Sequence, residues 1–259
     1  MGDENVKWKM ENKTMHRLKA DKEWLFEDSP ALGKEALKHL KVVRPKAGEV
    51  IELFDGAGAT RRYQVTPSGR DFVLEAAGER VETPRPPIAL TLFACVTKGA
   101  RWDWTLEKAT ELGVTRIVPV LSERTIVKVT PGERADKSAR WEKIVEEAAR
   151  QSDAVWLPEL LEPQDFVSAL RLASATDCYI GALTEPPSPM LAAALAERRG
   201  ENAAAEVSVF VGPEGDFTPA ELAALMKVAT PTSFGSTILR AETAAIFALS
   251  VVKGCLDAK

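Results

Sequence analysis

Two glycine-containing segments carry residue types and spacing that suit ligand binding. The first is Phe210 to Phe217 (FVGPEGDF) and the second is Phe234 to Thr243 (FGSTILRAET). Each leads from an apolar run through glycine into a helix-like segment, so the backbone can turn sharply and approach a ligand closely. Free N–H groups at the helix start would face that ligand. An ordinary strand-to-helix turn explains the first segment equally well, because Gly and Pro are common turn residues.

Arg240 and Glu242 are the candidate reactive side chains of the second segment. They stand at the start of a helix that the apolar pattern predicts over Glu242 to Leu256. An arginine at the positive end of a helix is electrostatically unfavourable unless an anion or a partner holds it. The alternative is a surface pair between Arg240 and a carboxylate. If both segments follow strands of one parallel sheet, they form a single ligand crevice.

Several common chemistries are excluded by the residues that the chain lacks. It contains no G-x-G-x-x-G, no phosphate-binding P-loop and no H-E-x-x-H motif. The three cysteines, Cys95, Cys178 and Cys255, are far apart, which favours three buried thiols over a disulfide framework or a zinc site. The chain has only two histidines, His16 and His39, so a catalytic triad or a histidine-based metal site would have to use one of them. We therefore expect no metal.

A proline-rich stretch, residues 82 to 87 (ETPRPP), marks a domain boundary, because clustered prolines favour an extended linker. Before it, alternating apolar residues predict a small β-rich domain with one helix. The predicted strands are Val50 to Phe54, Arg62 to Thr66 and Asp71 to Ala76, and the helix is Gly33 to Val43.

After the linker, apolar runs alternate with helical patterns, which is typical of a parallel sheet covered by helices. Trp141, Ile144, Val145 and Ala148 share one helical face. Gly113 predicts one helix end, and the capping box Thr218 to Glu221 predicts a helix start. The predicted strands are Ile88 to Val96, Arg116 to Leu121, Cys178 to Leu183, Val207 to Val211 and Thr232 to Phe234.

The composition describes a globular protein with a divided charge. The 259 residues are 45% hydrophobic and 28% charged, with a net charge of −4. Residues 1–85 hold 16 basic and 15 acidic side chains, against 18 and 23 in the remainder, and two local basic patches occur in the first part. Such patches suit RNA phosphates, although a solvated face explains them as well. No apolar run is long enough to span a membrane and no secretory signal is visible, so we expect a cytoplasmic protein.

Together, GPEGDFTPAEL and GSTILRAETAAIFAL resemble the two signature motifs of the RsmE family of SPOUT-class methyltransferases. Members of that family methylate N3 of a uridine in 16S ribosomal RNA with S-adenosylmethionine. Lys98, the run Lys108 to Val114, Ser122 to Arg124 and Gln151-Ser152 support the resemblance in the same order along the chain. It covers residues 14 to 256, including a PUA-like part around His16-Arg17 and Leu40 to Phe54.

The resemblance implies a fold, a set of partners and site residues. The fold would be a PUA-like β-barrel domain (residues 1–82) followed by a SPOUT domain (83–259), an α/β parallel sheet with helices on both faces and a C-terminal trefoil knot. The partners would be ribosomal RNA or the small ribosomal subunit and a second copy of the chain. Arg240 and Glu242 would be catalytic. The cofactor-binding residues would be Leu183, Val211, Gly212, Pro213, Glu214, Gly215, Phe234, Gly235, Ser236, Ile238 and Leu239. The RNA-binding residues would be His16, Arg17, Lys41, Arg44, Lys46, Lys98, Arg101 and Arg124.

Three positions depart from the family pattern. Asp216 stands where a second glycine is usual, Ser236-Thr237 where Pro-Arg is usual, and Ala154 where an arginine is usual. The first two adjoin the expected cofactor loops. They leave a second hypothesis open, a catalytically silent RNA-binding or ribosome-assembly factor of the same fold. An enzyme that acts on a metabolite is a third hypothesis, which leaves the basic patches unexplained.

Overall fold

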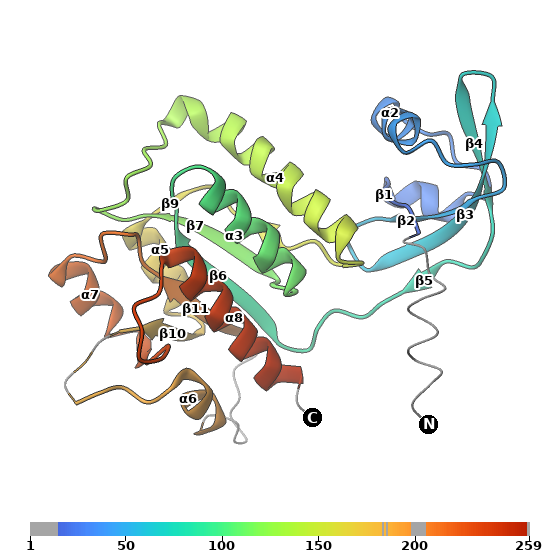
Figure 1. The fold of residues 1–259 in the computed structure, drawn as a ribbon. Coiled ribbons are helices and arrows are strands. Elements are labelled where there is room, and N and C mark those ends of the chain that lie inside the picture. The colour runs from blue at the N-terminus through green and yellow to red at the C-terminus, as the bar shows by residue number, and fades with distance from the viewer. Residues whose placement is uncertain (1–14, 183, 185, 198–205, 258–259) are drawn as a thin grey trace. The chain divides into compact units, whose positions relative to one another are not determined.

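The computed structural model describes residues 15–182, 184, 186–197 and 206–257 (Figure 1). Two compact units divide them. The first holds the described residues up to Arg85 together with Arg150–Trp156, and the second holds Pro86–Ala149 and the described residues from Leu157 onward.

The first unit is built on a five-stranded sheet. Its strands are β1 (Arg17–Lys19), β2 (Val50–Phe54), β3 (Ala59–Ser68), β4 (Asp71–Ala76) and β5 (Val81–Glu82), in the order β1-β2-β3-β4 with β5 beside β3. β1 is parallel to β2 and the other pairs are antiparallel. Helix α2 (Lys34–Val43) and the 3₁₀ turn η1 (Lys22–Phe26) complete it. The predicted helix and strands are confirmed, although β3 extends beyond the predicted run at both ends.

A short segment after helix α4 (Arg134–Gln151) packs with this first sheet. Gly58 donates its N–H to the Val155 carbonyl (3.0 Å), and Ala57 and Trp156 form an isolated antiparallel bridge. The Arg17 guanidinium donates to the Ala154 carbonyl over 3.1 Å. Nothing in the sequence pattern indicated this return, because a segment without strand periodicity carries no local sign of its distant partner.

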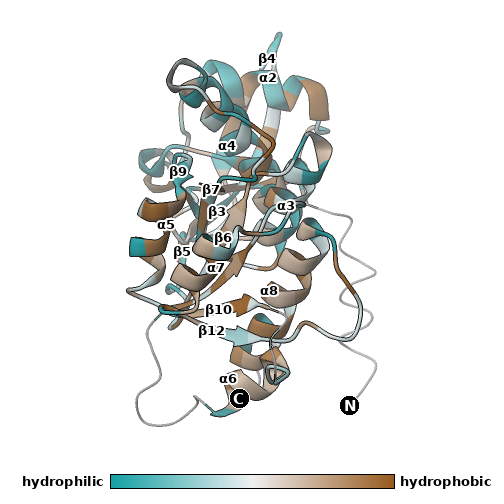
Figure 2. Cartoon of the chain, turned by 90° about the vertical axis from the view of Figure 1, so that its left-hand side faces the viewer, coloured by the Kyte–Doolittle hydropathy of each residue, from teal (hydrophilic) through white to brown (hydrophobic). Residues whose placement is uncertain are grey.

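The second unit contains a parallel sheet in the order β12-β10-β11-β6-β7-β8, with β9 also paired to β7. The strands are β6 (Ala89–Cys95), β7 (Arg116–Leu121), β8 (Glu159–Leu160), β9 (Gln164–Asp165), β10 (Asp177–Gly181), β11 (Glu206–Val211) and β12 (Ala229–Thr232). The last strand predicted from the sequence was misplaced. The predicted strand was Thr232 to Phe234, whereas β12 ends at Thr232. β12 is an edge strand, and polar residues with a proline are sufficient there. In Figure 2 it is teal beside the brown β10.

Helices cover both faces of this sheet, as expected. One core joins the sheet to α3 (Ala100–Glu111), α4 (Arg134–Gln151), α6 (Leu191–Glu197) and α8 (Ala241–Asp257). α3 and α8 lie side by side in Figure 1. The opposite face packs on α5 (Phe166–Ala173) and α7 (Pro219–Leu225). The short turn η2 (Pro131–Glu133) precedes α4. The predicted helical stripe is buried at Trp141, Val145 and Ala148 and half-buried at Ile144.

The cysteines contribute to packing. Cys95 and Cys178 are buried, and burial raises the pKa of the Cys95 thiol to about 12 and that of Cys178 to about 11. Cys255 is only half-buried, so full burial was expected wrongly for this one. Among the described residues, no helix has the length and apolar character to cross a membrane, and no three His, Cys, Asp or Glu side chains gather as metal ligands.

Candidate functional site

The strand order brings the two glycine segments to one edge of the second sheet. β10 pairs in parallel with both β11 and β12, so the carboxyl ends of all three strands meet at that edge. Gly212 begins the loop after β11, and Ser233 begins the loop after β12. Leu183, expected beside them after β10, lies outside the described residues. The crevice position that open α/β sheets use for ligands is therefore formed by the predicted loops.

The first loop is held by an aromatic ring and a helix cap. A Cβ atom added to Gly212 would lie 2.9 Å from Cε2 of Phe217, so only glycine leaves room for that ring. Thr218 caps α7, and Glu221 completes the capping box while accepting a hydrogen bond from the Glu123 N–H (2.9 Å). This contact ties the loop after β7 to α7.

Asp216 fits the first loop without distortion. Its φ of 58° lies in the left-handed region, where Asp and Asn are tolerated better than most residues after glycine. Its N–H donates to the Pro213 carbonyl (3.0 Å). The departure from glycine at this position therefore preserves the turn.

The second loop lies against β10. A Cβ atom on Gly181 would lie 2.6 Å from the Phe234 ring, which shows how closely the ring covers the end of β10. At the start of α6, the Ser233 N–H donates to the Pro189 carbonyl (2.8 Å) and the Ser233 carbonyl accepts from the Leu191 N–H (3.1 Å). Gly235 has a φ of 121°, a conformation that side chains rarely permit.

The rest of this loop is open to solvent. Ser236 is exposed, Ile238 is 95% exposed and Leu239 is half-buried. A large aliphatic side chain in water is free to contact a ligand or a partner.

Arg240 and Glu242 take different positions at the start of α8. The Arg240 side chain is exposed, and its carbonyl accepts the first helical hydrogen bond from Ala244 (2.8 Å). Glu242 is half-buried, and its Oε2 atom is inaccessible and has no hydrogen-bond partner in the described part of the chain. Within the described residues Arg240 forms no ion pair with Glu242 or with any other carboxylate, so the surface pair considered as the alternative is not observed there.

Two cations contact the first loop, and a third lies at the same sheet edge. Arg101 pairs with Glu214 (3.1 Å), and Arg124 donates to the carbonyls of Gly215 (3.0 Å) and Phe217 (3.4 Å). Lys98 is exposed in the loop after β6. All three predicted RNA-binding residues of this unit thus lie at the same sheet edge as the glycine loops.

The predicted RNA-binding residues of the first unit divide into two groups. His16 lies 3.6 Å from Glu49, Lys41 pairs with Asp71 (2.7 Å), and Arg44 and Lys46 are exposed. Arg17 instead lies in the interior, where its guanidinium pairs with Glu52 (2.8 Å) and covers the Phe54 ring. The Arg17 side chain is only 2% exposed, so it anchors the interior of this unit.

Sequence reasoning missed Thr97 and Gly181. Thr97 follows β6 at the same edge, is 2% exposed, and its Oγ1 atom has no partner among the described residues. A buried hydroxyl without a partner is uncommon and marks a place where a ligand group or water is accommodated. Gly181 lies inside the predicted strand Cys178 to Leu183 and ends the observed β10, and a glycine within a strand was the available signal for close backbone approach.

Comparison with known proteins assigns the family. A family described as RNA methyltransferase domain matches residues 84–253, and one described as RNA methyltransferase PUA domain matches residues 32–74. A relative from Synechocystis, named ribosomal RNA small subunit methyltransferase E, is 34% identical over 93% of this chain and 78% of its own. The chain belongs to this RNA methyltransferase family. A Bacillus subtilis protein of the same name is 27% identical over 88% of this chain and 91% of its own.

Solved structures agree with this assignment. Ribosomal RNA small subunit methyltransferase E from Neisseria gonorrhoeae, bound to S-adenosyl methionine, has a TM-score of 0.79 and 29% identity, covering 93% of this chain and 97% of its own. A putative methyltransferase from Legionella pneumophila with bound cofactor SAM has a TM-score of 0.77 and 26% identity, covering 93% and 97%. The RsmE resemblance and the α/β class with a PUA-like first domain are confirmed.

Replacing Gly181 with alanine should destabilise this family member's second unit by about 1–3 kcal/mol, because the new methyl group must displace the Phe234 ring. Chemical denaturation of the second unit measures the change. Gly254→Ala is the matched control. No atom lies within 4 Å of a Cβ at Gly254, which is inside α8, so this substitution should stabilise by about 0.5–1 kcal/mol. Equal effects of the two substitutions would contradict the close Phe234 contact.

Proposed function

We propose that this chain transfers a methyl group from S-adenosylmethionine to N3 of a specific uridine in 16S ribosomal RNA of the small subunit. The observation that carries this proposal is the meeting of both glycine loops, Arg240 and Glu242 at one carboxyl edge of a parallel sheet. The named relatives and the two cofactor-bound neighbours support the reaction class.

The residues at this edge suit S-adenosylmethionine. That cofactor has no phosphate, so backbone groups and apolar walls can hold it without a phosphate loop. We assign it to the sheet edge where two loops begin, with Val211 and the loop residues Gly212 to Gly215 from the first and Phe234, Gly235, Ser236, Ile238 and Leu239 from the second, and with Leu183 as a further expected contact. The unpartnered Thr97 Oγ1 and Glu242 Oε2 are buried polar atoms that a polar ligand would satisfy.

The bound cofactor supplies an electrophilic methyl group on a sulfonium. The nucleophile, uridine N3, carries a proton that must leave as the N3–CH3 bond forms and the S–CH3 bond breaks. Arg240 is exposed and unpaired among the described side chains, so its guanidinium is available to stabilise the negative charge that spreads onto the uridine carbonyl oxygens. We assign to Glu242 the role of accepting that proton through water.

The target uridine must be unpaired or flipped, because its N3 edge is buried in a duplex. We assign phosphate contacts to Lys98, Arg101 and Arg124 in the second unit and to His16, Lys41, Arg44 and Lys46 in the first. Residues 1–82 then act as the RNA-binding domain and 83–259 as the methyltransferase domain. Methyl transfer from labelled cofactor into small ribosomal subunits, followed by mapping of the modified base, tests the whole proposal.

We further assign a C-terminal trefoil knot, a cytoplasmic location and a homodimer to the chain. The dimer is supported by α8, which carries apolar residues around much of its circumference and is coloured mainly toward the hydrophobic end in Figure 2. Ile246, Phe247 and Val251 remain only half-buried in the single chain. A helix with an apolar arc wider than one core-facing stripe has further surface to bury.

Gly212→Ala should weaken binding of S-adenosylmethionine by about 10-fold or more, because a methyl group 2.9 Å from Phe217 forces the loop to move. Calorimetric titration measures the affinity, and Gly254→Ala, which adds a methyl group in open space, is the control. Unchanged affinity in Gly212→Ala would remove this loop from the cofactor site.

Arg240→Ala should lower turnover by about 10² to 10³-fold while cofactor affinity stays the same, on the scale of a lost transition-state contact. Single-turnover methyl transfer and calorimetry separate the two effects. Arg171→Ala, at an exposed position on α5, is the control and should keep full activity. A normal rate in Arg240→Ala would show that this side chain takes no part in the reaction.

The dimer should give a mass of twice the 28.2 kDa chain by light scattering at micromolar concentration. Val251→Asp should shift the mass toward that of the monomer, because it places a charge on the half-buried surface of α8. Ser250→Asp, on the exposed face of the same helix, should leave the dimer intact. A monomeric wild-type chain would contradict the assignment.

A further inference from the structure

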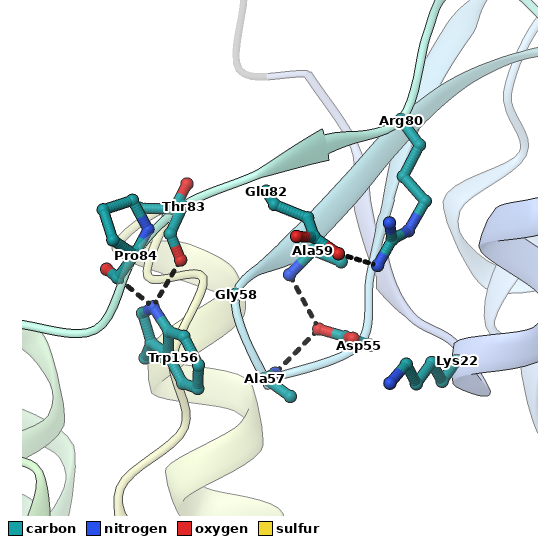
Figure 3. Close-up of a pocket in the computed structure, with 10 residues that line it drawn as sticks. All are labelled: Lys22, Asp55, Ala57, Gly58, Ala59, Arg80, Glu82, Thr83, Pro84 and Trp156. Atoms are coloured by element: carbon teal, nitrogen blue, oxygen red, sulfur yellow. Dashed lines mark hydrogen bonds and ion pairs between the residues drawn. The ribbon is translucent and has the colours of Figure 1, made fainter.

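The first unit contains a pocket that the methyl-transfer site does not use (Figure 3). Its volume is about 380 Å³, near the lower end of small-ligand pockets and sufficient for one nucleotide. The turn between β2 and β3 forms the floor, and Lys22 of η1, the stretch from Arg80 to Pro84 and Trp156 form the walls.

The walls are fixed by hydrogen bonds before any ligand binds. The Asp55 carboxylate accepts from the N–H groups of Ala57 (2.7 Å) and Ala59 (3.0 Å), which closes the turn. Thr83 donates its N–H to the Gly58 carbonyl over 2.8 Å. A ligand that enters such a preorganised pocket loses little binding energy to the ordering of loops.

The indole of Trp156 is held in one orientation. Its Nε1 donates to the carbonyls of Thr83 (3.1 Å) and Pro84 (3.2 Å). A Cβ on Gly58 would lie 2.5 Å from the ring, so the indole packs directly on the turn. Trp156 therefore presents a rigid aromatic surface at one side of the pocket, as Figure 3 shows.

Two residues that line the pocket, Trp156 and Arg80, each take part in a contact between a cation and an aromatic ring. The Arg85 guanidinium lies over Trp156 (5.0 Å to the ring centre), and that of Arg80 lies over Phe26 (4.3 Å), a ring that is 62% exposed. Lys22 is exposed and has no ion-pair partner within the described stretches. Aromatic faces for bases, interleaved with cations for phosphates, are the features with which proteins bind single-stranded RNA.

Two carboxylates narrow the class of ligand. Asp55 lies between Trp156 and the pair of Lys22 and Arg80, and Glu82 lines the same pocket while pairing with Arg80 (2.6 Å). Carboxylates only accept hydrogen bonds when ionised, so they favour a base with an exocyclic amino group and repel a free inorganic anion. Adenine, cytosine and guanine carry that amino group, whereas uracil does not.

We infer that this pocket binds one unpaired, amino-bearing nucleotide of the RNA substrate, other than the uridine that is methylated. The base stacks against the Trp156 ring together with the Arg85 guanidinium, its amino group toward the carboxylates, and the phosphate faces Lys22 and Arg80. The inference rests on RNA being the substrate, as proposed above, but it requires neither the cofactor nor methyl transfer.

The test uses the full chain and fluorescein-labelled single-stranded RNA pentamers of adenosine, cytidine or uridine, with fluorescence anisotropy as the readout. Adenosine and cytidine pentamers should bind more tightly than the uridine pentamer. Lys22→Glu and Arg85→Glu should each weaken binding by about 10-fold, the scale of one stacking or phosphate contact. Arg70→Glu makes the same charge change at the far end of β3, in the turn before β4, and should alter binding less than 2-fold.

Photocrosslinking of a pentamer that carries 5-iodocytidine locates the base directly and should label Trp156 or Phe26. Crosslinks confined to the second unit, equal losses in Arg70→Glu and Lys22→Glu, or no preference against uridine would each overturn the inference. Methyl transfer into small subunits is measured separately. A wild-type chain that binds the pentamers but methylates no subunit would overturn the proposed function and leave this pocket assignment standing.

Discussion

Aromatic rings that lie directly on glycine backbone fix the functional loops of both units. Phe217 covers Gly212, Phe234 covers Gly181 and Trp156 covers Gly58. In each pair the ring lies so close to the glycine that a Cβ atom there would clash with it. A ring in this position replaces a flexible turn by a packed contact, so backbone groups keep their orientation without regular secondary structure. The cofactor loops proposed here and the pocket of the first unit depend on this one kind of contact.

At the sheet edge of the second unit, some charged side chains have partners and others have none among the described residues. Arg101 and Arg124 are engaged by Glu214 and by loop carbonyls, and so they support the first loop. Arg240 lies exposed at the positive end of α8, while Glu242 keeps a buried oxygen without a partner. Groups held in electrostatically unfavourable positions are characteristic of sites where a substrate completes the interactions.

Local sequence patterns predicted the elements well because the signals of strands, caps and turns lie within a few residues. The limits of β2, β4 and β7 were predicted to the residue, and the Thr218 capping box and the Gly113 helix end are present. The last strand, β12, was misplaced because it lacks such a local signal. An edge strand needs no apolar run, so residues 229–231 gave no signal, while the following Phe234 is apolar because it packs on Gly181.

The sequence by itself determined the glycine loops, the helix at whose start Arg240 and Glu242 stand and, through its motifs, the methyltransferase family. Only the tertiary structure decided which of these loops meet, because strand order depends on contacts between distant residues. It also placed Arg17 in the interior and brought Trp156 to the turn at Gly58, almost a hundred residues earlier in the chain. Neither placement leaves a periodic signal, since each depends on a single long-range contact and not on a repeated local pattern.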